Sequence, residues 1–149
     1  MLVIVLAAAS AAGWGTRLRN GRFRERGSGS GPGPGSDAAG SALTEADLGS
    51  CLGERATLVQ FSTEQCAYCG PTRELLAEVA RSRDGVALVE IDASRRMDLT
   101  RRLNVFSTPT VFVLAADGSI ARRASGQPRK ADVLAAVSSM LDRAPLGRE

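Results

Sequence analysis

The sequence predicts an α/β fold, with one domain built on a central mixed sheet that has helices on both faces. Three observations support this prediction. The chain has 149 residues, of which 44% are hydrophobic, enough for one domain with a substantial core. From residue 41 onward, helix and strand patterns alternate in the order α-β-α-β-α-β-β-α. The last two strands flank Ala116-Asp117-Gly118, a hairpin turn signal, so an antiparallel pair is expected beside parallel strands.

Residues 1–16 precede this domain and are predicted to form a transmembrane anchor. Residues 1–15 are apolar apart from Ser10. As a helix they would extend about 22 Å, which is shorter than the ~30 Å hydrocarbon core of a bilayer. A cleaved signal peptide is the alternative, because Ala9-Ser10-Ala11 fits a cleavage site. Against it, no charged side chain precedes the apolar stretch.

Residues 17–26 follow as a basic juxtamembrane segment. They hold five arginines and one glutamate, a net charge of +4, so the total of +3 leaves residues 27–149 at −1. Trp14 and Phe23 are expected at the membrane interface. Because arginine-rich flanks stay in the cytoplasm, the order predicts a single-pass protein of the cell membrane whose domain faces the cytoplasm. A nucleic-acid-binding protein would carry its basic residues on the folded domain, so no nucleic-acid partner is expected.

Residues 27–40 are predicted to be a flexible linker. Six Gly, three Ser and two Pro among these 14 residues cannot build a core. The folded domain is therefore expected over residues 41–144.

Local patterns place the elements of this domain. Thr44 is a typical N-cap before an acidic first turn, and the first helix should end by Gly53. The next elements are predicted, in chain order, over residues 57–62 (strand), 67–82 (helix), 86–91 (strand), 97–103 (helix), 110–114 (strand), 120–124 (strand) and 130–141 (helix). Strand 86–91 is mostly apolar, so it is expected to be buried on both faces.

The cysteines are the residues of this chain that can do chemistry near neutral pH. The sequence has no histidine, which excludes Ser-His-Asp and Cys-His nucleophile pairs and His-ligated metal sites. Three cysteines are too few for a disulfide framework, but two of them form Cys66-Ala67-Tyr68-Cys69. A zinc site would need a second pair of ligands, and Cys51 is the one cysteine left. No metal is therefore expected.

The placement of Cys66 favours thiol–disulfide exchange. Cys66 lies between strand 57–62 and the following helix, near the N-cap, where free N–H groups and the helix dipole favour a thiolate. Cys69 lies one turn further on the same face, close enough to attack a mixed disulfide at Cys66. The alternative is two unrelated buried cysteines. Cys51, near the end of the first helix, is expected to be a small buried hydrophobe, with a regulatory thiol as its alternative.

Two segments resemble the thioredoxin family. Residues 61–80, FSTEQCAYCGPTRELLAEVA, resemble the active-site strand, loop and helix of thioredoxins, and residues 103–110, LNVFSTPT, resemble the stretch that carries their cis-proline. Gly126 matches a glycine that faces the active site, and the resemblance covers roughly residues 55–142. It implies a thioredoxin-like fold, a cis bond before Pro109, and a substrate peptide that pairs with the backbone of Thr108.

The resemblance also implies that Cys66 attacks and Cys69 resolves, but the sequence departs from the family pattern. Ala67-Tyr68 replaces the usual Gly-Pro between the cysteines, and Gln60 stands where thioredoxins keep a buried Asp that handles protons for the resolving thiol. A neutral amide cannot take that proton. A second register, centred on Tyr68-Cys69-Gly70-Pro71, would make Cys69 a lone nucleophile.

Together these features predict a membrane-tethered, thioredoxin-like thiol–disulfide oxidoreductase that reduces protein disulfides. It would act on protein thiols and disulfides, receive electrons from an upstream dithiol donor, and need no metal or organic cofactor. Two alternatives stay open. One is an exported oxidoreductase outside the membrane, and the other is a non-catalytic thioredoxin-fold binding module.

Overall fold

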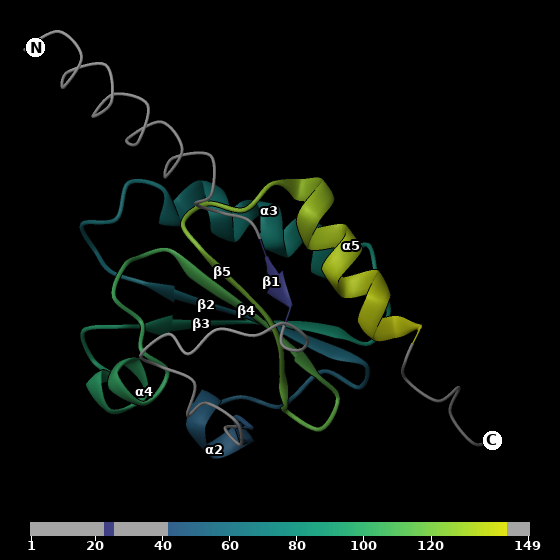
Figure 1. The fold of residues 1–149 in the computed structure, drawn as a ribbon, viewed down its shortest axis with the longest axis horizontal. Helices are drawn as coiled ribbons and strands as arrows, with labels where there is room; N and C mark the ends of the chain where they lie inside the picture. The colour runs from purple at the N-terminus through teal and green to yellow at the C-terminus, as the bar shows by residue number, and fades with distance from the viewer. Residues whose placement is uncertain (1–22, 26–41, 143–149) are drawn as a thin grey trace, which may run out of the picture.

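The computed structural model describes residues 23–25 and 42–142, which form a mixed sheet with helices on both of its faces (Figure 1). The five strands lie in the order β1-β5-β4-β2-β3. The elements are β1 (Arg24–Glu25), α2 (Glu45–Leu48), β2 (Ala56–Ser62), α3 (Cys69–Arg81), β3 (Val86–Asp92), α4 (Met97–Arg102), β4 (Thr110–Ala115), β5 (Ile120–Ser125) and α5 (Lys130–Leu141).

The pairing of the strands confirms the predicted mixed sheet. β2 runs parallel to β3 and antiparallel to β4, and β4 runs antiparallel to β5 across the predicted hairpin. The helix and strand order from residue 44 to residue 141 is also the predicted one. The carboxyl ends of β2 and β3 therefore lie side by side, and the chain leaves β2 there to enter the loop that carries Cys66.

Two hydrophobic clusters cover the two faces of the sheet. On one face, α3 and α5 pack against β2 and β4 through side chains such as Leu76, Val79 and Val137. On the other face, α2 and α4 contribute Leu48 and Leu99 to a second cluster. The layers are visible in Figure 1, where α3 and α5 lie on the opposite side of the sheet from α2 and α4. Burial on both faces makes β2 a rigid support, because all seven of its residues are buried.

Strand β3 corrects one expectation. It was predicted to be buried on both faces, but it is an edge strand that pairs with β2 alone. Val89 and Ile91 are buried, whereas Glu90 is exposed. A run of apolar residues indicates a buried strand, but it does not specify how many neighbours the strand has.

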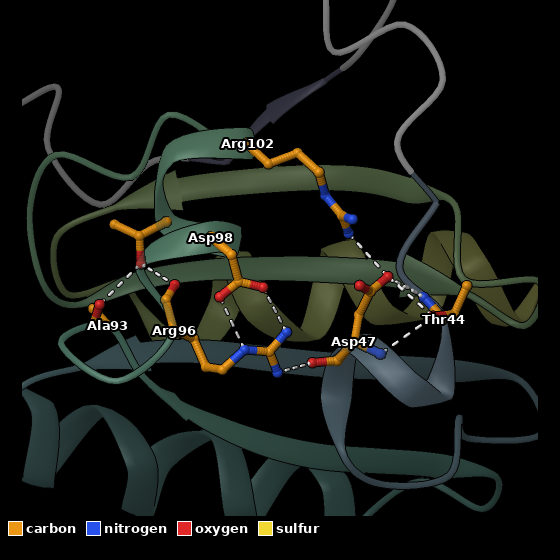
Figure 2. A network of polar contacts seen from close by, with 7 residues as sticks. Thr44, Asp47, Ala93, Arg96, Asp98 and Arg102 are labelled. Carbon is orange, nitrogen blue, oxygen red and sulfur yellow. Dashed lines mark hydrogen bonds and ion pairs between the residues drawn. The ribbon is translucent and has the colours of Figure 1, made fainter.

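Helix α2 is joined to α4 by a network of charged side chains (Figure 2). Thr44 caps α2 in a capping box with Asp47, and the helix ends at Gly49, which has a left-handed φ of 66°. The Asp47 carboxylate accepts a hydrogen bond from the Arg102 guanidinium at 2.9 Å, and Arg96 donates to the Asp47 carbonyl oxygen. The short helix α2 is therefore held by contacts with α4 as well as by Leu48.

Residues 23–25 add a short strand that was not predicted. The backbone of Arg24 and Glu25 pairs antiparallel with β5, opposite Arg123 and Arg122. Phe23 is partly buried against the cluster under α5, so it is wrong to place this side chain at a membrane interface. The predicted anchor (1–16), linker (27–40) and most of the basic segment lie outside the described residues, as does Trp14. Within 23–25 and 42–142, no helix is long and apolar enough to span a bilayer.

Candidate active site

Cys66 and Cys69 form a disulfide at the start of α3. The two sulfur atoms are 2.11 Å apart and the Cα atoms are 5.4 Å apart. Buried strand β2 ends at Ser62, and the loop that follows turns back through two hydrogen bonds, from Cys66 N–H to the Thr63 carbonyl and from Cys69 N–H to the Cys66 carbonyl. The pair is thereby fixed between a rigid strand and a long helix.

The two cysteines differ in exposure. Helix α3 begins at Cys69, so Cys66 lies in the loop just before the helix rather than in its first turn. Cys66 is half-buried, whereas Cys69 is 5% exposed and is the first residue of α3. A partner disulfide can therefore approach the sulfur of Cys66 more easily than that of Cys69.

The Thr108–Pro109 loop lies beside this disulfide loop. The peptide bond between Thr108 and Pro109 is cis, as the resemblance implies. The Oγ1 atoms of Thr63 and Thr108 are 3.2 Å apart, which joins the two loops directly. Gly126 donates its N–H to the Pro109 carbonyl at 2.8 Å and has a φ of 86°, a left-handed conformation that favours glycine. The structure thus brings Thr108, Pro109 and Gly126 together, and the Thr63–Thr108 contact joins this loop to the loop that carries Cys66.

A hollow of about 460 Å³ opens beside the two cysteines. Its lining is polar and is made by Ser62, Thr63, Glu64, Cys66, Cys69, Gly70, Arg73, Glu90 and Asp92. One of its walls is fixed by Glu90, which accepts a hydrogen bond from Ser62 Oγ at 2.7 Å and pairs with Arg73 at 3.1 Å. Sequence reasoning missed this wall, since Arg73 and Glu90 are 17 residues apart and lie on two different elements, α3 and β3.

Gln60 lies in the interior, behind the disulfide. Its side chain is fully buried, and its Nε2 donates to the Cys69 carbonyl oxygen at 2.8 Å. Its other amide atom, Oε1, has no hydrogen-bond partner among the described residues. The position that departs from the thioredoxin pattern therefore contacts the backbone of Cys69.

Arg123 is a further residue that sequence reasoning missed. From β5 its guanidinium donates to the carbonyl oxygens of Leu103 and Asn104, at 2.7 and 2.6 Å, and it lies over the Phe112 ring at 5.2 Å from the centroid. Burial lowers the pKa of Arg123 from its usual value. These bonds hold the chain that leads from α4 into the Thr108–Pro109 loop. The available signal was an arginine on a half-buried strand, which does not specify a distant partner.

Cys51 differs from its expectation. It was predicted to be a buried hydrophobe near the end of the first helix, but α2 already ends at Leu48, and Cys51 is exposed and free. The left-handed cap at Gly49 ends the helix two residues before Cys51. In 23–25 and 42–142 there is also no cluster of three or more His, Cys, Asp or Glu side chains that could hold a metal ion.

Comparisons with known proteins agree with this fold. A family model described as a thioredoxin-like domain matches residues 52–141. A mutant thioredoxin from Halobacterium salinarum is 20% identical, with a TM-score of 0.56 over 62% of this chain and 80% of that one. Chloroplastic thioredoxin z is 25% identical, with a TM-score of 0.52 over 58% and 79% of the two chains. Mitochondrial thioredoxin 3 from Saccharomyces cerevisiae is 16% identical, with a TM-score of 0.51 over 58% and 79%.

No curated protein matches the chain. The structural likenesses below 25% identity show the fold alone, whereas the family model covers more than half of the 149 residues. A thioredoxin fold with a Cys-x-x-Cys pair supports thiol–disulfide oxidoreductase chemistry in general. On the family match, the shared fold and the position of Cys66 and Cys69 before α3, this chain belongs to the thioredoxin family.

Proposed function

We propose that this protein reduces disulfide bonds in other proteins, with Cys66 as the attacking thiol and Cys69 as the resolving thiol. The observation that carries the proposal is the disulfide at the start of α3, whose more exposed member, Cys66, lies in a loop that Thr63 joins to the Thr108–Pro109 loop. The substrates are protein disulfides, and a dithiol of another system returns the electrons. Neither step requires a metal or an organic cofactor.

The exchange proceeds in two steps. In the reduced protein, the Cys66 thiolate attacks one sulfur of the substrate disulfide, that bond breaks, and the first substrate thiolate leaves. Cys69 then gives its proton to solvent and attacks the Cys66 sulfur, which releases the second substrate thiolate. Two electrons pass to the substrate, and the Cys66–Cys69 disulfide forms. A dithiol donor reduces it again by the same chemistry in reverse.

The surroundings of Cys66 suit an extended substrate segment. Thr108 is half-buried and contacts Thr63 in the loop that carries Cys66, and its backbone is proposed to pair with the substrate chain. Gly126 adds no side chain next to Pro109, so the substrate backbone can approach closely. The hollow beside the disulfide leaves room for side chains that flank the substrate cysteine.

A stoichiometric electron-transfer assay tests this proposal. The full chain is reduced, freed of reductant and mixed with excess insulin as the protein disulfide, and the new insulin thiols are counted. We expect about two thiols per protein molecule, with Cys66–Cys69 recovered as a disulfide by mass spectrometry. Cys51→Ser is the matched control, because Cys51 is exposed and outside the pair. It should keep the full yield.

Failure of electron transfer by a folded, fully reduced protein would contradict the proposal and favour the non-catalytic binding module. Loss of electron transfer in Cys51→Ser would also contradict it, because the chemistry would then depend on Cys51.

We further propose that the domain is tethered to the cell membrane and faces the cytoplasm. The support is the order of residues 1–15, which are apolar apart from Ser10, and residues 17–26, which hold five arginines. In this orientation, cytoplasmic reductants can reach the thiol pair.

Thiol labelling in intact cells tests the orientation. Replacing Cys66 and Cys69 by serine leaves Cys51 as the single thiol of the chain, and it is exposed. A membrane-impermeant thiol reagent should label Cys51 after lysis but not before, with recovery in the membrane fraction. Labelling of intact cells would favour the exported oxidoreductase, and a soluble form that starts near Ala12 would show that the apolar segment is cleaved.

A further inference from the structure

Gln60 holds a hydrogen-bond acceptor that the oxidised protein does not satisfy. The side chain is fully buried, and Nε2 is fixed to the Cys69 carbonyl at 2.8 Å. Oε1, on the same amide carbon, has no partner within 23–25 and 42–142. Leaving a buried acceptor unpaired is unfavourable, because the atom loses its hydrogen bonds to water and gains none in return. An atom in this position therefore points to a donor that is present in another state of the protein.

The hydroxyl groups on the same side of the sheet already donate elsewhere. Ser62, two residues along β2 from Gln60, donates Oγ to Glu90 at 2.7 Å. Thr72, buried in the first turn of α3, donates Oγ1 to the Tyr68 carbonyl at 2.7 Å. Val111 pairs with Gln60 across the sheet, and Leu58 is two residues before it on the same face of β2. Both are apolar and buried, so their side chains offer no donor.

The remaining candidate donor is created by reduction. In the disulfide, the Cys69 sulfur carries no hydrogen and can donate nothing. Reduction by two electrons and two protons breaks the S–S bond and leaves Cys69 as a thiol, whose S–H is a weak donor. This thiol belongs to the residue whose backbone carbonyl already anchors the Gln60 amide, and it is nearly as buried as the amide, at 5% exposure.

We infer that Gln60 is a positioning residue that senses the redox state: its Oε1 accepts a hydrogen bond from the Cys69 thiol in the reduced protein and is unpaired in the disulfide. This inference rests on the proposed redox cycle of Cys66 and Cys69 and deepens it. Because the bond exists in one state alone, Gln60 stabilises the dithiol relative to the disulfide. The bond also favours the protonated form of Cys69 until a mixed disulfide has formed at Cys66. The Cys69 proton then leaves to solvent, because the amide cannot accept it.

Equilibration with glutathione tests the thermodynamic part. Full-length protein carrying Cys51→Ser, so that the active pair holds the two remaining thiols, is equilibrated in buffers of varied reduced and oxidised glutathione. The reduced fraction is then counted by alkylation and mass spectrometry. In Gln60→Leu, the ratio of squared reduced glutathione to oxidised glutathione at the midpoint should rise about tenfold, the equivalent of one buried acceptor left unpaired.

Thr72→Val is the matched control. It removes a buried side-chain bond to a backbone carbonyl at the same end of α3, but that bond does not depend on the sulfur atoms. Its midpoint should stay within about twofold of the parent. Equal midpoints for Gln60→Leu and the parent would overturn the inference, as would the same shift in both variants, which would show a merely structural effect on the start of α3.

An infrared measurement reads the bond directly, and its result for the protein with Gln60 intact does not depend on the folding of a Gln60 variant. In protein carrying Cys51→Ser and Cys66→Ser, Cys69 is the single thiol. Its S–H stretching band should lie at lower frequency than that of an unbonded thiol, and Gln60→Leu should return it to the unbonded position. A band at the unbonded position in the parent would contradict the inference.

These readouts separate the inference from the proposed function. A protein that reduces insulin normally but shows an unbonded Cys69 band would refute the role of Gln60 alone. A protein with the bonded band and the tenfold midpoint shift that transfers no electrons to protein disulfides would refute the reductase alone.

Discussion

Asp47→Asn should weaken the contact between α2 and α4 with a characteristic dependence on pH. One carboxylate oxygen of Asp47 accepts hydrogen bonds from Arg102 at 2.9 Å and from the backbone and hydroxyl of Thr44, each at 3.0 Å (Figure 2). The Arg102 guanidinium, and next the Thr44 N–H, lower the pKa of Asp47 from 3.8 to about 2. Asparagine keeps the shape and an acceptor oxygen but removes the charge.

The size of the effect follows from this pKa. A carboxyl group with a pKa of about 2 in the folded state and 3.8 in the unfolded chain contributes at most ~2.5 kcal/mol at neutral pH. Solvent screens the pair, because the Arg102 side chain is 43% exposed. We therefore expect Asp47→Asn to lower the free energy of unfolding by about 1 kcal/mol at pH 7.

The direction in which pH changes this contribution to stability follows from the lowered pKa of Asp47. Because folding lowers the pKa of Asp47, its contribution is fully present above pH 3.8 and is lost as the pH falls toward 2. The difference between the parent and Asp47→Asn should therefore be constant from pH 7 to pH 5 and shrink on further acidification. High salt should reduce this difference in part, because it screens the ion pair between Asp47 and Arg102 in the parent.

Urea unfolding followed by far-ultraviolet circular dichroism measures these differences. Asp84→Asn is the matched control, because Asp84 is an exposed carboxylate in the turn between α3 and β3. It should leave the midpoint unchanged at every pH. If Asp47→Asn matched Asp84→Asn at pH 7, or if its loss of stability were as large near pH 2 as at pH 7, the account of the α2–α4 contact would be refuted.

Two further substitutions test the positions that shape the fold and the loop beside the thiol pair. Gly118→Ala should lower the free energy of unfolding by about 2 kcal/mol, because Gly118 has a φ of 79° and an added Cβ would lie 2.2 Å from the Leu43 carbonyl oxygen. Gly70→Ala, with no atom within 4 Å of its Cβ, is the control, and equal urea midpoints for the two variants would contradict the prediction. Arg123→Met keeps the apolar stem but loses two bonds to loop carbonyls, so it should cost about 2 kcal/mol and slow insulin reduction by the reduced protein, whereas an unchanged rate would show that these bonds do not position the loop.

Much of the fold could be predicted because the local patterns agree with the tertiary structure. Leu76 and Val79 are buried on one side of α3 as their helical spacing predicts, and the hairpin lies at Asp117-Gly118. The cysteine pair could be found because a strand, a Cys-x-x-Cys and a helix follow one another directly along the chain. Signals of this kind depend on neighbours in sequence.

The features that could not be predicted depend on partners far apart in the chain. The pairing of Arg24 with β5 adds a charged two-residue segment that carries no strand signal of its own. Glu90 is exposed because β3 has one neighbouring strand, which its own sequence does not specify. The bond from Gln60 to Cys69 requires the packing of α3 onto β2, so the sequence marks the unusual residue but not its contact.

Trapping of a mixed disulfide tests the central claim, that Cys66 attacks and Cys69 resolves. Protein carrying Cys51→Ser and Cys69→Ser keeps Cys66 as its single thiol, and protein carrying Cys51→Ser and Cys66→Ser keeps Cys69. Each is reduced, mixed with a protein disulfide, and mapped by mass spectrometry without reductant. Half-buried Cys66 should form a stable mixed disulfide rapidly, whereas buried Cys69 should form little. Rapid trapping by Cys69 with none by Cys66 would contradict the assignment and favour the register centred on Cys69.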